Sequence, residues 1–169
     1  LIEGEVVAVP ERVLTQGLPA GMHTLVLEVE DGLNAPVTSS IDVQVVDLTP
    51  PVMSPVANPA LLWPPTGDMR TVVIDTYAMD SSGGAVTLSA RVSSNEPRWQ
   101  SYFGKPDWST PVIDQTTGRL TVQLRAEVNL NGNVREYTIW LTATDKAGNK
   151  TNARLPVRVA WRRGAGCWF

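Results

Sequence analysis

Few residues in this chain have the chemistry that catalysis needs. Its 169 residues include one histidine, His23, and one cysteine, Cys167. A lone imidazole without a partnered nucleophile cannot form a catalytic triad, and these two residues cannot build a multi-histidine metal site or a disulfide. The sequence therefore predicts a protein that is not an enzyme and carries no organic cofactor.

The acidic residues permit one kind of ligand site. Calcium takes several oxygen ligands, and loop carboxylates that gather at the joint between two modules can supply them. Asp31, Asp47 and Asp145 each occupy a predicted turn or joint, and they are the candidates for a calcium site. No Asp-x-Asp cluster of known loop spacing supports the metal site. The alternative is that each turn aspartate accepts hydrogen bonds from its own turn's backbone.

Aromatic residues supply the other candidate contacts. A stretch at 98–117 is interpreted as an irregular insertion rich in aromatic rings, and one further tryptophan alternates onto the outer face of a predicted strand. The candidates for ligand or interface contacts are Trp99, Tyr102, Phe103, Trp108 and Trp140. Such rings can form a platform for sugars or anchor a protein partner. The alternative is that the insertion folds back and its rings cover one end of the domain.

Alternation of apolar and polar residues runs through much of the chain and predicts β-strands. Residues 41–45, 120–124 and 155–159 each alternate with a period of two. Turn-forming clusters such as Asn131-Gly132-Asn133 separate these runs. Short strands between turns, with no convincing helical stretch, predict an all-β protein built as an antiparallel β-sandwich.

The chain contains an internal repeat. A shift of 114 positions places residues 23–46 on residues 137–160 without a gap, so that Asp31 falls on Asp145 and Val43 falls on Val157. Each copy is therefore a strand, a turn that begins with aspartate, and a second strand. A repeat at about the length of a domain indicates tandem modules.

The repeat also predicts the domain boundaries. Residues 1–46 correspond to the C-terminal half of a first module, which is incomplete or completed by another segment or chain. Residues 47–51 form a proline-rich joint, which two prolines stiffen. Residues 52–160 have the length of a complete sandwich, and residues 161–169 form a tail.

Two further residues are predicted to be structural. Tyr137 stands near the start of the penultimate strand, where sandwich domains often place a tyrosine whose hydroxyl bonds a nearby backbone carbonyl. His23 occupies the matching place in the first copy of the repeat, so we expect the same role for it.

Several motifs resemble known modules. Asp47-Leu48-Thr49-Pro50-Pro51-Val52 resembles the joint that opens many bacterial immunoglobulin-like repeats, and Leu62-Trp63-Pro64-Pro65 looks like a recurrent motif of one subgroup. Residues 137–149 are similar to the closing hairpin of hyalin-repeat, polycystic-kidney-disease-type and cadherin-like modules. The resemblance implies an immunoglobulin-like fold, tandem modules, and no catalytic residues to carry over.

The same resemblance implies where such a protein works. These modules occur in secreted or cell-surface bacterial proteins, where they act as spacers, stalks, adhesive units or filament subunits. The alternative is a carbohydrate-binding appendage of an exported enzyme that uses the loop aromatics. The tail Gly164-Ala165-Gly166-Cys167 resembles the start of cysteine-containing sorting signals, which makes Cys167 a candidate anchoring point.

Net charge and hydropathy limit the classes of partner that this chain is expected to bind. The net charge of −3 and the pI near 5.1 argue against a nucleic-acid partner. No apolar run is long enough to span a membrane. The expected partners are neighbouring immunoglobulin-like modules or subunits, with a surface glycan as the further candidate.

Overall fold

The computed structural model describes residues 17–96, 106–128 and 134–160, and all of their regular structure is β-strand. The chain divides into two compact units, Leu1–Asp47 and Leu48–Phe169. The described residues contain no helix that is long and apolar enough to cross a membrane.

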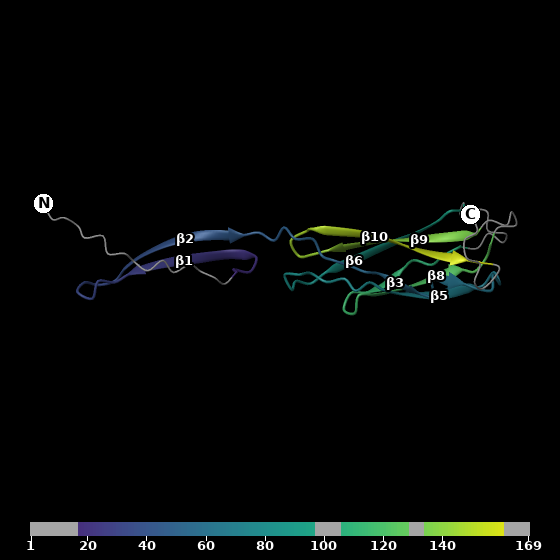
Figure 1. Cartoon of the computed structure of the whole chain (residues 1–169), viewed down its shortest axis with the longest axis horizontal. Coiled ribbons are helices and arrows are strands. Elements are labelled where there is room, and N and C mark those ends of the chain that lie inside the picture. Colours follow the sequence, from purple (N-terminus) through teal and green to yellow (C-terminus); the bar gives the residue numbers. More distant parts are fainter. Residues whose placement is uncertain (1–16, 97–105, 129–133, 161–169) are drawn as a thin grey trace. The chain divides into compact units, whose positions relative to one another are not determined.

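The described part of the first unit is an antiparallel hairpin of β1 (Gly21–Val29) and β2 (Val37–Val45) (Figure 1). Leu25 lies opposite Ile41 in it. Its turn is held by Asp31, whose carboxylate accepts hydrogen bonds from the backbone N–H groups of Leu33 and Asn34. Gly32 adopts a φ of 74° there, a left-handed conformation that costs glycine little.

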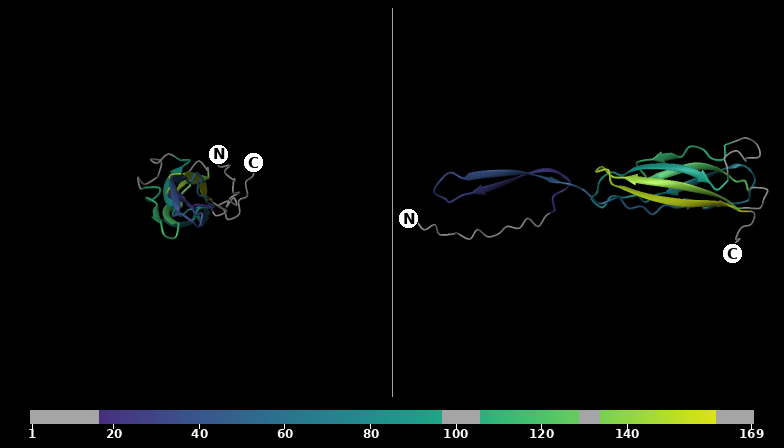
Figure 2. Two further views of the ribbon diagram at one scale, coloured as in Figure 1. Left: turned by 90° about the vertical axis from the view of Figure 1, so that its left-hand side faces the viewer. Right: turned by 90° about the horizontal axis from the view of Figure 1, so that it is seen from above.

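The second unit is a sandwich of two four-stranded sheets, which Figure 1 and Figure 2 show as two facing layers. One sheet has the order β4-β10-β9-β6, and the other has the order β3-β5-β8-β7. All pairs are antiparallel except β10 with β4. The strands are β3 (Val56–Asn58), β4 (Leu61–Leu62), β5 (Met69–Asp75), β6 (Thr87–Ser94), β7 (Val112–Asp114), β8 (Arg119–Arg125), β9 (Arg135–Thr144) and β10 (Lys150–Val159).

The core lies between the two sheets and follows from the alternation along the strands. In β9 every second residue from Arg135 to Ala143 is buried, and the residues between them are half-buried on the outer face. The facing sheet contributes side chains that are almost fully buried as well, namely Val72, Ile74, Leu120, Val122 and Leu124. Full burial of each such aliphatic side chain stabilises the fold by about 1.5–3 kcal/mol, which makes this layer the main source of stability.

The two copies of the sequence repeat have the same pairing register. Leu25 lies opposite Ile41 in β1–β2, and Ile139 lies opposite Leu155 in β9–β10, which is the same pair shifted by 114 positions. The open ends of the two hairpins agree as well: Gly21 pairs with Val45, and Arg135 pairs with Val159.

The part of the predicted insertion that the structure describes, residues 106–117, contains a strand. This strand, β7, pairs with β8 through a tight turn in which Asp114 accepts the N–H groups of Thr116 and Thr117. Trp108 also forms an isolated β-bridge with Leu124. A three-residue strand is too short to show a clear period, so the alternation did not identify it.

The division between the two units falls within the predicted joint at residues 47–51. The second unit begins at Leu48, and Pro51 is buried in it, where its carbonyl oxygen accepts a hydrogen bond from the hydroxyl of Thr151. Residues 48–51 of the predicted joint therefore belong to the second unit, and of these Pro51 is buried, beside the start of β10.

Candidate functional site

A cluster of charged side chains is buried at one end of the second unit, and we call it the arginine cluster. It consists of Arg135, Glu96, Asp107, Arg125 and Tyr137, all of which are less than a tenth exposed. Arg135 opens β9 and donates to Glu96 Oε2 from Nε at 2.8 Å and from Nη2 at 2.6 Å. Its Nη1 donates to Asp107 Oδ1 at 3.1 Å. One guanidinium thus joins the segment after β6 to the segment before β7.

Tyr137 completes the arginine cluster from the inner face of β9. Its hydroxyl donates to the carbonyl oxygen of Arg125 at 2.9 Å and accepts a hydrogen bond from Arg135 Nη1 at 3.1 Å. Burial raises the pKa of Tyr137 to about 12. Trp108 stands edge-on to the tyrosine ring, with 6.3 Å between the centroids.

The second arginine of the cluster donates its hydrogen bonds to backbone, and its Nε lies 4.0 Å from Asp107 Oδ1. Arg125 donates to the carbonyl oxygens of Gly67 at 2.7 Å and Pro106 at 2.9 Å. Burial works against the charge of Arg135, but its hydrogen bonds to Glu96 outweigh that cost and raise its pKa. The carboxylates of the cluster are therefore held as partners of guanidinium groups, an arrangement that orders chain segments.

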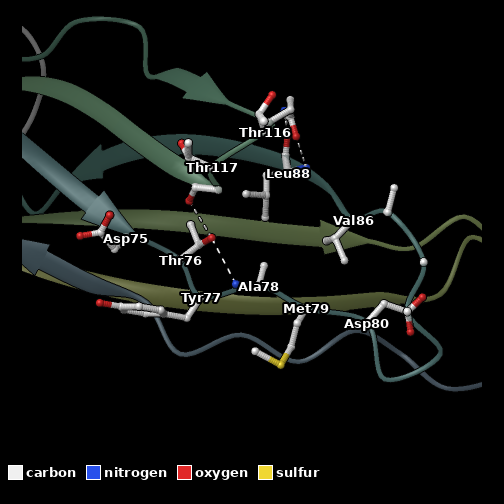
Figure 3. Close-up of a pocket in the computed structure, with 15 residues that line it drawn as sticks. Asp75, Thr76, Tyr77, Ala78, Met79, Asp80, Val86, Leu88, Thr116 and Thr117 are labelled. Atoms are coloured by element: carbon white, nitrogen blue, oxygen red, sulfur yellow. Dashed lines mark hydrogen bonds between the residues drawn. The ribbon is translucent and has the colours of Figure 1, made fainter.

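A pocket of about 460 Å³ lies at another part of the second unit. Its lining comes from the loop after β5, from Gly83 to Leu88, and from the β7–β8 turn. Figure 3 shows Thr76 and Thr117 on one side of Leu88 and Val86 on the other, with Asp80 below Val86. The side-chain amide of Gln115 pairs with both the N–H and the carbonyl of Leu88 at 2.8 Å each, as a neighbouring strand would.

The acids near this pocket are ionised and held in their own turns. Asp80 accepts hydrogen bonds from the hydroxyl and the N–H of Ser82, and these lower its pKa. The pKa of Asp114 is lowered in the same way, mainly by the hydroxyl of Thr117. Carboxylates with lowered pKa values are anions at neutral pH, so neither is suited to donate a proton.

The calcium candidates belong to two turns and to the predicted joint. Asp31 binds Asn34 in the β1–β2 turn, and the backbone N–H of Asn34 is the main reason that its pKa falls to about 2. Asp145 is buried in the β9–β10 turn and accepts the backbone and side-chain N–H groups of Asn149. Asp80 and Asp145 offer carboxylate oxygens within 4.8 Å of each other, and Asp47 is the last residue of the first unit. Calcium binding stays a prediction.

Two of the aromatic candidates, Trp108 and Trp140, belong to the described residues. Trp99, Tyr102, Phe103 and the anchoring candidate Cys167 lie outside them. Trp108 is half-buried against the core. Trp140 is half-buried on the outer face of β9, where its Nε1 donates to Ser93 Oγ at 2.9 Å.

The sole histidine lies in the first unit. His23 Nε2 is 2.6 Å from the carbonyl oxygen of Pro19, so its ring contacts backbone, as Tyr137 does at the equivalent position. Pro19 is four residues before His23, so this contact is local in the chain.

Sequence reasoning did not identify Arg135, which is central to the arginine cluster. A signal was present in the sequence. Every second residue of this strand points inward, and counting back from Leu141, Ile139 and Tyr137 places Arg135 on the same inner face. A charged residue at an inward position requires a buried partner. Its partners Glu96 and Asp107 are 39 and 28 positions away, and no local pattern connects them to it.

Comparison with family models, with curated proteins and with solved structures gives no match for this chain.

Proposed function

We propose that this chain is a non-catalytic structural or adhesive part of a secreted or cell-surface bacterial protein. In this proposal, immunoglobulin-like modules follow one another and act as a spacer, a stalk or an assembly unit. The observation that carries it is the repeated hairpin, since β1–β2 and β9–β10 share one register at a separation of 114 residues. Tandem copies of one building unit are typical of proteins that span distance.

The strand order of the second unit supports the immunoglobulin-like assignment. Constant-type immunoglobulin domains have the order ABED in one sheet and CFG in the other. Numbering β3, β5, β6, β7, β8, β9 and β10 as A to G gives A-B-E-D for one sheet and G-F-C for the other. Tyr137 near the start of the sixth of these strands, bonded to the carbonyl of Arg125, corresponds to the tyrosine corner of such domains.

The uncovered face of the first hairpin supports an incomplete first module. Leu27 is 65% exposed, whereas Leu141 at the equivalent position is 1% exposed. Leu25 and Ile139 differ in the same way, at 39% and 0%. An isolated two-stranded hairpin is marginally stable in water. We infer that strands equivalent to β3–β8, from another segment or chain, complete this module and bury that face.

The alternative function, a carbohydrate-binding appendage that uses the loop aromatics, has less support. Trp108 was to be part of its platform, but this ring packs edge-on against Tyr137 in the core. A ring held between β-strands has little surface left for stacking on a sugar.

A hairpin graft tests the proposal. In the full chain, residues 137–160 are replaced by residues 23–46. This graft retains Arg135, and the apolar side chains of both strands still point toward the core. We expect the second unit of this variant to fold, with reduced stability because His23 replaces the buried Tyr137. The measurement is the cooperative denaturant unfolding of the grafted chain.

The control graft inserts residues 22–45 at the same place. A shift of one residue turns every apolar side chain to the opposite face of the sheet, so this variant must fail to form the core. If the two grafts unfold alike, or if neither folds, the hairpins are not equivalent and the tandem assignment is wrong.

A further inference from the structure

The outer face of the sheet formed by β6, β9 and β10 carries an unusual group of side chains. Arg91, Trp140 and Arg154 lie side by side across the three strands, as their register requires. Lys150 and Arg158 stand four positions before and after Arg154 on the same face of β10. We call these five residues the basic face.

The basic face has little compensating acid. Arg158 pairs with Glu136 at 2.8 Å, and Glu136 is the one acidic side chain that β6, β9 and β10 place on this side. Arg91, Lys150 and Arg154 are exposed, and within the described part of the chain Lys150 and Arg154 form no ion pair. A concentration of cations on a chain of net charge −3 marks a surface that attracts anions.

Trp140 holds one of these cations in place. The guanidinium carbon of Arg91 lies 4.6 Å from the centre of the Trp140 ring, and Trp140 Nε1 is bonded to Ser93 Oγ. Stacking on an aromatic ring leaves the N–H donors at the edge of a guanidinium free to bind a carboxylate or sulfate. Such an ordered arginine loses little conformational entropy when it binds an anion.

The internal repeat shows that the fold does not require these cations. β1–β2 repeats the register of β9–β10, yet it contains no lysine or arginine. Val26 stands at the position equivalent to Trp140, and Ser40 at that of Arg154. On the same outer side the first hairpin carries Glu28 and Asp42. The basic face is therefore a property of the second unit rather than of the hairpin.

We propose that the basic face binds an acidic polysaccharide. Lys150, Arg154 and Arg158 recur every four residues along β10, which places successive cations roughly 13 Å apart in a line, a spacing suited to a linear polyanion. The side chains between them, Asn152 and Pro156, are small, and β9 adds a row of threonine hydroxyls.

The polar surroundings of Trp140 favour a polysaccharide over a protein partner. Tryptophan and arginine are enriched at protein–protein interfaces, but the centre of such an interface is apolar and depleted in lysine. Here the central ring, Trp140, is overlaid by Arg91, and hydroxyl, amide and cationic groups surround it. This inference depends on the second unit alone, so it stands or falls separately from the tandem arrangement.

Retention of the full chain on immobilised polysaccharides tests this assignment. We expect binding to heparin or to polygalacturonate at low salt, affinity that falls with added salt, and no binding to neutral dextran. The two acidic probes distinguish sulfate from carboxylate recognition. Arg154→Glu should weaken binding roughly tenfold, the equivalent of one charge-assisted hydrogen bond. Arg91→Gln should weaken binding as well while leaving the unfolding transition nearly unchanged.

Arg70→Glu is the matched control, because Arg70 is exposed on β5 of the other sheet and the net charge changes equally. The proposal is overturned if the unaltered chain binds neither acidic polysaccharide, if it binds dextran equally well, or if Arg70→Glu weakens binding as much as Arg154→Glu. Binding to duplex DNA or to polyglutamate at least as tight as to the acidic polysaccharides overturns the assignment to a polysaccharide.

Discussion

Arg135 is the residue on which the stability of the arginine cluster depends most. Its guanidinium neutralises Glu96 and Asp107, both buried. Arg135→Gln would leave these carboxylates buried without their cation, and removal of one partner from a buried ion pair costs about 3–5 kcal/mol. We expect this loss in the free energy of unfolding from urea titration.

The control for that substitution is Arg119→Gln. Arg119 pairs with Asp75 at 2.8 Å, but the two side chains are 59% and 38% exposed. An exposed pair contributes about 0–1 kcal/mol because water and salt screen it. If both variants lose the same free energy, the arginine cluster has no special role in stability.

Tyr137 makes the second unit sensitive to alkali. Its pKa rises to about 12 on burial, whereas the unfolded chain loses this proton near the ordinary value of 10.0. The stabilisation is complete below pH 10 and is lost as the pH rises toward 12, because only the unfolded state releases the proton in that window. We expect urea stability to fall steeply there, and Tyr137→Phe to remove that extra slope.

The same substitution has a second, pH-independent effect. Without the hydroxyl, the carbonyl oxygen of Arg125 and one donor of Arg135 lose a buried partner. The cost at neutral pH should be about 1–3 kcal/mol. An alkaline slope that persists in Tyr137→Phe would mean that another group titrates.

At the scale of elements, alternation predicted strands of seven residues or more. Residues 41–45, 120–124 and 155–159 lie within β2, β8 and β10. The short strands β3, β4 and β7 were not identified, since two or three residues cannot show a period. β3 and β4 are also separated by Pro59, and they join different sheets. Such placement is decided by tertiary pairing, which local sequence does not encode.

The repeated hairpin offers a matched pair of substitutions at this scale. Leu141→Ser removes a side chain from the filled core and should cost about 2–5 kcal/mol. Leu27→Ser changes the equivalent residue of the first hairpin, which is exposed, and should cost less than about 0.5 kcal/mol. Urea unfolding of each variant measures both values.

The two results together report whether the first hairpin is covered. If Leu27→Ser costs as much as Leu141→Ser in the isolated chain, its face is already buried, by a second copy for example. A concentration-dependent transition would identify that second copy. If the cost appears only when the completing strands are supplied, the incomplete-module proposal gains its direct support.

At the scale of the whole molecule, the chain divides into two compact units at Asp47. The tandem modules that the repeat predicted stay a prediction. The exact boundary could not be predicted from the sequence. Two adjacent prolines predicted a stiff joint at residues 47–51, and Pro51 is buried beside Thr151, a contact between residues 100 positions apart. Proline restricts the backbone locally, while burial depends on partners that fold onto it from elsewhere in the chain.

The independence of the second unit is the last prediction. A fragment of residues 48–160 keeps both sheets, the arginine cluster and the Pro51–Thr151 hydrogen bond, so its melting temperature should lie within about 2–4 °C of the value for the full chain. A fragment of residues 60–160 loses β3 and the bridge between Val52 and Met79, and it should melt far lower. Calorimetry of both fragments decides the matter. If the longer fragment melts as low as the shorter one, the first unit contributes to the stability of the second, and the two are not independent modules.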